Sequence, residues 1–115
     1  MMFFRRTVKQ PEVMLACVDI KDGQLIHRRS NGALTCVDID DLRRAELRVL
    51  EQQLYWYLED QRGAFALIAE RTEGIGRVRR YLSSWRGFDY DGLLRFDSEQ
   101  QSHLQLWPML LERAA

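Results

Sequence analysis

The sequence predicts an α+β fold, in which an antiparallel sheet of about five to six strands is followed by one longer and one shorter helix near the C-terminus. Asp22-Gly23 and Asn31-Gly32 are dipeptides that favour tight hairpin turns, and strand-forming residues flank both. Apolar residues at helical spacing begin after Gly74. The 115 residues fit one domain, residues 1–115, with an ordered core expected over about residues 13 to 108.

The first part of the predicted sheet is a meander of three strands, at about residues 13 to 21, 24 to 30 and 33 to 39. If both turns contain two residues, counting outward pairs Val18 with His27, and His27 with Cys36. One face then carries Ala16, Val18, Ile20, Leu25, His27, Leu34 and Cys36, and the other carries Val13, Leu15, Cys17, Ile26, Arg28, Thr35, Val37 and Ile39. Both faces are substantially apolar, so something is expected to cover each of them.

Residues 40 to 62 fit two interpretations. Leucines at helical spacing and many helix formers indicate a long helix, opened by one of the aspartates at its start. The alternation of AELRV, residues 45 to 49, and the aromatic run LYWYL, residues 54 to 58, instead favour strands, with residues 64 to 70 as a partner. Secondary-structure propensity alone does not decide between a helix and strands for residues 40 to 62.

The pattern after Gly74 predicts a helix that ends at Gly87. Its core-facing stripe consists of Ile75, Val78, Tyr81, Leu82 and Trp85. Asp89 is expected to cap a short second helix, and residues 103 to 107 form a last strand that Pro108 ends. The aromatic residues between Tyr81 and Phe96 are therefore expected to belong mainly to the core.

Composition argues against several classes of partner. Seventeen basic residues balance seventeen acidic ones, so the chain lacks the positive field of a protein that binds nucleic acid through phosphates. The opening MMFFRR places apolar residues before the arginines, unlike a signal peptide. The longest nearly apolar run, residues 13 to 18, is far below the roughly 20 residues that cross a bilayer. We expect a soluble cytoplasmic protein with no nucleic-acid or membrane partner.

The residues that most often carry chemistry form no recognised motif. The two cysteines and two histidines lack the close pairings of a zinc site, so we predict no catalytic, cofactor-binding or metal-binding residues. The predicted register puts Cys17 and Cys36 on opposite faces, which favours two buried free thiols in a reducing compartment. His27 beside Cys36 would offer a base and a nucleophile, but no orienting third group is identifiable.

Three stretches resemble a family of short uncharacterised bacterial proteins: DGQLIHRRSNGALTCVDIDDL from Asp22, LYWYL from Leu54, and WRGFDYDGLLRF from Trp85. The resemblance spans about residues 13 to 108, although the family has Trp where this chain has Ile39. It implies a pleckstrin-homology-like domain, a curved antiparallel sheet closed by a helix, and it favours strand at residues 44 to 50. It implies no catalytic residues.

The absence of a chemical motif and the two apolar sheet faces favour a non-enzymatic module that binds a protein partner or forms a homodimer. The predicted interaction face is Leu15, Ile26, Arg28, Val37 and Ile39. Two alternatives remain open. One is an immunity or inhibitor protein of a toxin system, and the other is a small enzyme that uses His27 and Cys36.

Overall fold

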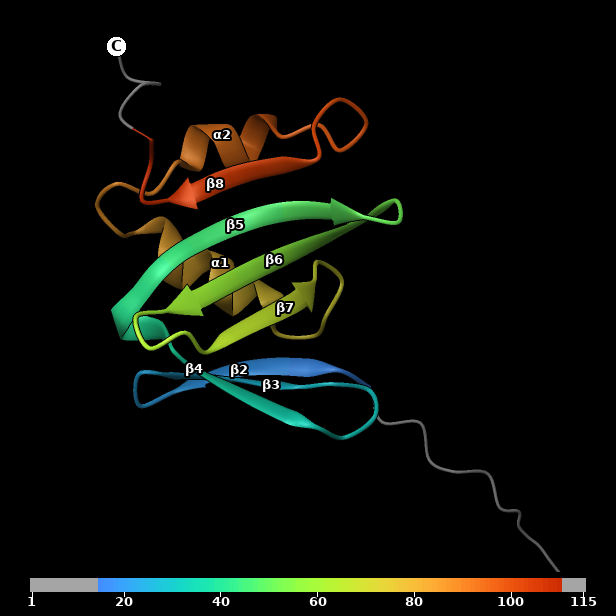
Figure 1. Cartoon of the computed structure of the whole chain (residues 1–115), viewed down its shortest axis with the longest axis vertical. Coiled ribbons are helices and arrows are strands. Elements are labelled where there is room, and N and C mark those ends of the chain that lie inside the picture. Colours follow the sequence, from blue (N-terminus) through green and yellow to red (C-terminus); the bar gives the residue numbers. More distant parts are fainter. Residues whose placement is uncertain (1–14, 111–115) are drawn as a thin grey trace, which may run out of the picture.

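The computed structural model describes residues 15–110, which form two antiparallel sheets and two helices (Figure 1). The first sheet has the order β2-β3-β4, with β2 Cys17–Lys21, β3 Gln24–Arg28 and β4 Leu34–Asp38. A 3-10 turn, η1 Ile39–Asp41, leads to the second sheet. That sheet has the order β7-β6-β5-β8, with β5 Leu42–Leu50, β6 Gln53–Asp60, β7 Phe65–Ala69 and β8 His103–Trp107.

The helices lie between β7 and β8 in the chain: α1 is Ile75–Ser83 and α2 is Tyr90–Arg95. The predicted α+β class and the pair of one longer and one shorter helix are confirmed. The strands differ from the prediction, because the described chain has seven strands in two sheets rather than about five to six in one. Asp89 caps α2 as predicted, since its side chain accepts a hydrogen bond from the Gly92 N–H at 2.9 Å.

Residues 40 to 62 form strands, which resolves the open choice. In β5, Ala45 and Leu47 are buried on one side, and in β6, Trp56 and Leu58 are buried on the same side of the sheet. A period of two therefore decides the conformation, although the local composition is equally compatible with a helix. Leu50 pairs with Gln53 across a two-residue turn whose residues both have positive φ, as a type I′ hairpin requires.

The first sheet follows the predicted register in one hairpin and departs from it in the other. Val18 pairs with His27 across the Asp22-Gly23 turn, as predicted. The second turn is longer, because the Arg29 N–H donates to the Ala33 carbonyl at 2.9 Å and encloses a three-residue loop. Ile26 therefore lies opposite Cys36. A shift of one residue moves every side chain of β4 to the other face.

One continuous core connects both sheets and α1. It contains Val18, Leu25 and Val37 from the first sheet, Trp56, Leu58, Ile68 and Leu106 from the second, and Val78 and Leu82 from α1. Figure 1 shows α1 behind the four-stranded sheet, where it covers one face. The expectation that the aromatic stretch belongs to the core is correct for Phe88, and Tyr81, Trp85 and Phe96 pack partly buried against it. Tyr90 is an exception, with half its surface exposed.

Candidate functional site

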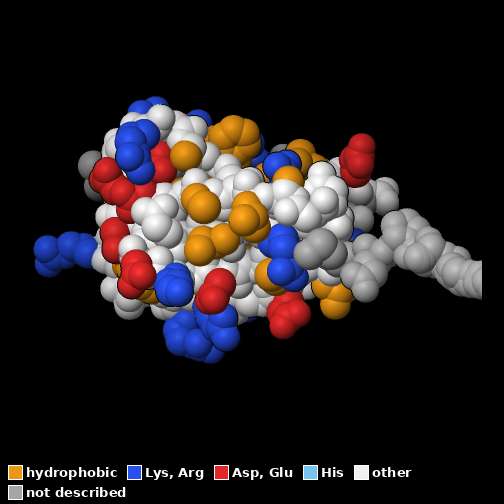
Figure 2. Space-filling model, turned by 90° about the horizontal axis from the view of Figure 1, so that it is seen from below, with side chains coloured by type: hydrophobic (Ala, Val, Ile, Leu, Met, Phe, Trp, Pro, Cys, Tyr) orange, Lys and Arg blue, Asp and Glu red, His pale blue; other side chains and the backbone are white. Residues whose placement is uncertain are grey.

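The outer face of the three-stranded sheet is the side that points away from this core. We define the outer face as the alternate residues of β2, β3 and β4: Cys17, Asp19, Lys21, Gln24, Ile26, Arg28, Leu34, Cys36 and Asp38. Figure 2 looks at the molecule from below Figure 1, where this sheet lies. Hydrophobic side chains gather near the middle of that surface, and charged side chains surround them.

The hydrophobic part of the outer face is exposed to an unusual degree for apolar residues. Leu34 is 63% exposed, and Leu15, just before β2, is 71% exposed. Ile26 lies half-buried between Cys36 on β4 and Asp19 on β2. The result is an apolar centre with charged neighbours, the arrangement typical of protein contact surfaces.

This surface corrects the predicted interaction face. Leu15, Ile26 and Arg28 lie on it or beside it, but Val37 and Ile39 are completely buried in the core. The reason is the three-residue loop before β4, which turns Val37 inward and brings Leu34 and Cys36 outward. The outer face is apolar at its centre, as predicted, but Leu34 and Cys36 contribute to it in place of Val37 and Ile39.

The thiols lie on the same face, contrary to the predicted register. Cys17 on β2 and Cys36 on β4 are separated by the whole width of β3 and lie opposite different residues of it, which places their backbones more than roughly 9 Å apart. A disulfide needs Cα atoms closer than about 7 Å, and both cysteines are free, as predicted. They are not the buried thiols that we expected, because Cys36 is exposed and Cys17 is half-buried.

The proposed base and nucleophile are not brought together. His27 points into the protein and Cys36 points out of it, since they lie on opposite faces of the sheet. His27 pairs instead with Thr35. Burial lowers the pKa of the His27 imidazole, and the nearby Arg29 charge lowers it further. The geometry therefore offers no support for an enzyme that uses His27 and Cys36 as a pair.

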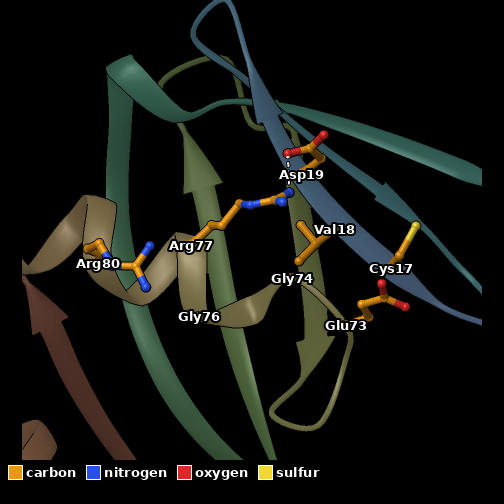
Figure 3. A pocket seen from close by; sticks show the side chains of 8 residues that line it. All are labelled: Cys17, Val18, Asp19, Glu73, Gly74, Gly76, Arg77 and Arg80. Carbon is orange, nitrogen blue, oxygen red and sulfur yellow. Dashed lines mark hydrogen bonds and ion pairs between the residues drawn. The ribbon is translucent and has the colours of Figure 1, made fainter.

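A hollow of about 430 Å³ lies where α1 meets β2 (Figure 3). Arg77 extends from α1 to β2 and forms an ion pair with Asp19 at 2.8 Å. The Val18 N–H donates to the Glu73 carbonyl at 2.9 Å, and Gly74 follows with a φ of 96°. A side chain at Gly74 would collide with the Val18 carbonyl. These contacts make the hollow a joint between α1 and the first sheet.

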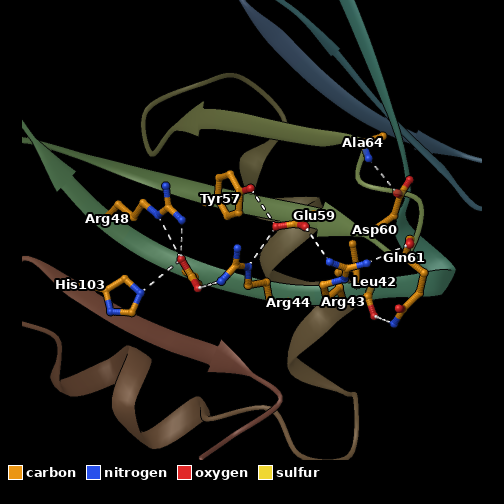
Figure 4. A network of polar contacts seen from close by, with 11 residues as sticks. Leu42, Arg43, Arg44, Arg48, Tyr57, Glu59, Asp60, Gln61, Ala64 and His103 are labelled. Atoms are coloured by element: carbon orange, nitrogen blue, oxygen red, sulfur yellow. Dashed lines mark hydrogen bonds and ion pairs between the residues drawn. The ribbon is translucent and has the colours of Figure 1, made fainter.

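The outer side of the four-stranded sheet carries a network of polar and charged residues in which Arg44, Arg48 and His103 surround Glu46. Figure 4 shows this network. Glu46 is 3% exposed, and its carboxylate accepts hydrogen bonds from Arg48 at 2.9 and 3.0 Å and from Arg44 at 3.4 Å. The His103 Nε2 atom lies 3.2 Å from the same carboxylate. The network therefore links β5 to β8 across the sheet.

A second carboxylate, Glu59, extends the network to β6. The Tyr57 hydroxyl donates to it at 2.9 Å and the Arg44 Nε donates at 3.0 Å, and these bonds lower the pKa of Glu59. The Arg48 guanidinium lies over the Tyr57 ring, 3.8 Å from its centroid. Both carboxylates are paired with arginines inside the network, so we interpret it as a link across three strands rather than a binding site.

No family model, curated protein or solved structure matches the chain. Between residues 15 and 110, no group of three or more His, Cys, Asp or Glu side chains is arranged to hold a metal ion. No helix in that part of the chain is long and apolar enough to cross a membrane.

Proposed function

We propose that the protein is a non-enzymatic, cytoplasmic protein-interaction module that binds through the outer face of its three-stranded sheet. The observation that carries the proposal is the exposure of Leu34, at 63%, beside Ile26 and Cys36. An exposed leucine alone is ordinary, but adjacent apolar residues on a flat sheet face favour contact with another protein.

A second copy of the same chain is the partner that the charges favour. Arg28 lies beside Leu34, and Asp19 lies beside Ile26. Asp19 is paired with Arg77 of the same chain but stays exposed, so each copy presents a cation and an anion close to the apolar centre. In a contact with twofold symmetry the same patch meets itself, and the acidic group of one copy can face the basic group of the other. Balanced charges of this kind suit self-association better than binding to a strongly charged partner.

The expected dimer is weak. Three strands of five residues present a face of roughly 240 Å², from the usual strand spacing and rise. Stable interfaces bury about 800 Å² on each partner. Leu15 enlarges the patch only modestly, so we expect association that becomes visible toward about 100 μM rather than a permanent dimer.

The sequence resemblance belongs to the same proposal. We infer a relation to the short bacterial proteins with pleckstrin-homology-like sheets. It is supported by the order of elements: a strand meander, an aromatic hairpin, a helix and a closing strand that ends at Trp107. That relation implies no catalytic residue, which agrees with a binding role.

Sedimentation velocity from about 1 to 100 μM tests the second-copy proposal. We expect the wild-type sedimentation coefficient to rise with concentration and Leu34→Glu to abolish the rise, because a hydrated carboxylate would replace an exposed apolar side chain in the contact. Leu94→Glu is the matched control, since Leu94 on α2 is 66% exposed and α2 lies away from the three-stranded sheet (Figure 1). Circular dichroism verifies that both variants fold. A wild type that stays monomeric throughout would overturn self-association, and equal effects of both variants would overturn the assignment to this face.

A further inference from the structure

A hollow of about 600 Å³ lies between the two sheets, on the side of the first sheet opposite to the outer face. His27, Arg29 and Thr35 line it from the first sheet, and residues 63 to 67 line it from the β6–β7 turn and β7. The outer face takes no part in it.

The polar groups of this hollow lack partners within residues 15–110. The His27 side chain is only 5% exposed, yet it makes no hydrogen bond to the described chain, and its ring nitrogens are not sealed from solvent as Arg28 Nε is. Thr35 lies directly opposite His27, and its hydroxyl is also unpaired. The Arg29 guanidinium forms no ion pair in the same region. Because the His27 ring nitrogens reach solvent inside the hollow and meet no hydrogen-bonding group of residues 15–110, they are available to a ligand there.

The remaining wall is apolar. Ala64, Ala66 and Leu67 line it, and Phe65 is 54% exposed at the edge strand β7. A cation, two neutral hydrogen-bonding groups and an exposed aromatic ring therefore surround one space of a size that suits a small molecule.

We propose that this hollow binds a small organic carboxylate with an apolar tail. The Arg29 guanidinium would pair with the carboxylate, and the His27 ring N–H and the Thr35 hydroxyl would donate hydrogen bonds to it. The tail would lie against Phe65 and Leu67. A ligand without the carboxylate should bind more weakly because it cannot pair with Arg29. A ligand without the apolar tail should bind more weakly because it does not contact Phe65 and Leu67.

Ligand binding at this hollow depends on pH in a defined direction. Arg29 is the charged group that lines the hollow with His27; Thr35 and residues 63 to 67 are uncharged. Burial and Arg29 lower the pKa of His27, so the imidazole is neutral at neutral pH. A bound carboxylate would offset both effects and raise that pKa. Binding therefore takes up a proton and tightens as the pH falls through the pKa of His27 in the complex.

NMR titration of the intact protein with sodium 3-phenylpropionate tests the site. We expect saturable shifts of the His27 ring signals and a higher His27 pKa in the complex, with no such change at His103 on the outer side of the other sheet. The neutral alcohol 3-phenylpropan-1-ol should bind at least about threefold more weakly, because it cannot pair with Arg29. Unchanged His27 signals up to about 10 mM of the acid, or equal binding of the alcohol, would overturn the proposal.

Variants separate this site from general effects on charge and folding. Arg29→Gln and Thr35→Val should each weaken binding by about three- to fivefold. Arg86→Gln removes an exposed arginine that does not line the hollow and should leave binding unchanged. If Arg86→Gln weakens binding as much as Arg29→Gln, the carboxylate is attracted by overall charge and the site is refuted. Leu34→Glu should not alter carboxylate binding, which keeps this proposal distinguishable from the proposed protein contact.

Discussion

The ring of Trp85 meets the ring of Trp107 edge to face, with centroids 5.1 Å apart and an angle of 82° between the planes. Trp85 follows α1, and Trp107 ends β8, so this contact fastens the helix to the last strand. The Trp107 indole N–H donates to the Arg86 carbonyl at 3.0 Å and adds a second link between the same segments. The aromatic contact therefore adds to the backbone hydrogen bonds that join the same segments, from the Asp89 N–H to the Leu106 carbonyl and from the Met109 N–H to the Gly87 carbonyl.

Replacing Trp85 with alanine should lower the free energy of unfolding by about 2 to 4 kcal/mol. The loss combines buried indole surface with the edge-to-face contact. Because Trp85 is only partly buried, the loss stays below the largest values known for tryptophan. Trp85→Phe should cost less than half as much, because it retains a ring. Urea denaturation measures both. A change below about 1 kcal/mol for the alanine variant would show that the indole has no packing role.

Gly74 and Gly76 form a matched pair for testing the joint between α1 and β2. Gly74→Ala should destabilise the protein by about 3 kcal/mol or more, since its φ is 96° and a Cβ atom would lie 2.0 Å from the Val18 carbonyl oxygen. Gly76→Ala should instead stabilise it by about 0.5 to 1 kcal/mol, because Gly76 is helical with no atom in the way of a Cβ. Thermal and urea melts should therefore shift in opposite directions, and two equal shifts would contradict the geometry of this joint.

Asp60 should contribute stability that acid removes. It is 1% exposed, and its carboxylate accepts hydrogen bonds from the backbone N–H groups of Asp38, Arg62 and Ala64 at 2.9 to 3.0 Å. Burial raises the pKa of Asp60, but the three donors outweigh burial, and the net pKa is lowered. Its stabilisation is therefore complete above the unfolded pKa of about 3.9 and is lost as the pH falls through the lower folded value.

Asp60→Asn should thus cost about 2 kcal/mol at pH 7, since an amide cannot accept all three bonds. The difference from wild type should shrink below about pH 4. Asp41→Asn, at an exposed carboxylate, serves as the control and should change stability little. Denaturation at pH 7, 4 and 3 measures the difference in stability between Asp60→Asn and wild type. A difference that is constant over that range would show that the ionised carboxylate of Asp60 does not stabilise the turn between β6 and β7.

Both cysteines should react with an alkylating reagent in denaturant without prior reduction, because the width of β3 separates them. In the folded protein, Cys36 should react faster than Cys17, since Cys36 is exposed and Cys17 is half-buried. Mass spectrometry over time measures the order. Faster labelling of Cys17 would contradict the register of β4.

Sequence patterns predicted elements better than they predicted the face of β4. The Asp22-Gly23 turn and the α1 stripe were readable because their residues have few alternatives. The Asn31-Gly32 signal was ambiguous, because a two-residue loop and a three-residue loop can both contain this dipeptide. The observed loop has three residues, and this one-residue difference places Leu34 and Cys36 on the outer face in place of Val37 and Ile39.

Local sequence patterns do not predict which strands lie next to each other in a sheet. The turn at Glu51 and Gln52 lacks Gly and Asn, so the hairpin of β5 and β6 had no turn signal. The Glu46 network and the hollow beside His27 both combine residues from different strands. Glu46 on β5 and His103 on β8 look like ordinary surface residues until the sheet order places them together.

The most direct test of the proposed protein contact replaces Leu34 with a photoreactive phenylalanine analogue in the full chain and irradiates intact cells that hold the protein at about 100 μM. Leu94, which is 66% exposed where Leu34 is 63% exposed, receives the same analogue as the matched control. We predict a discrete crosslinked protein product from position 34 and none from position 94, with a mass of twice the 13.6 kDa chain if the partner is a second copy. The absence of a product from position 34, or equal products from both positions, would contradict the claim that the outer face binds protein.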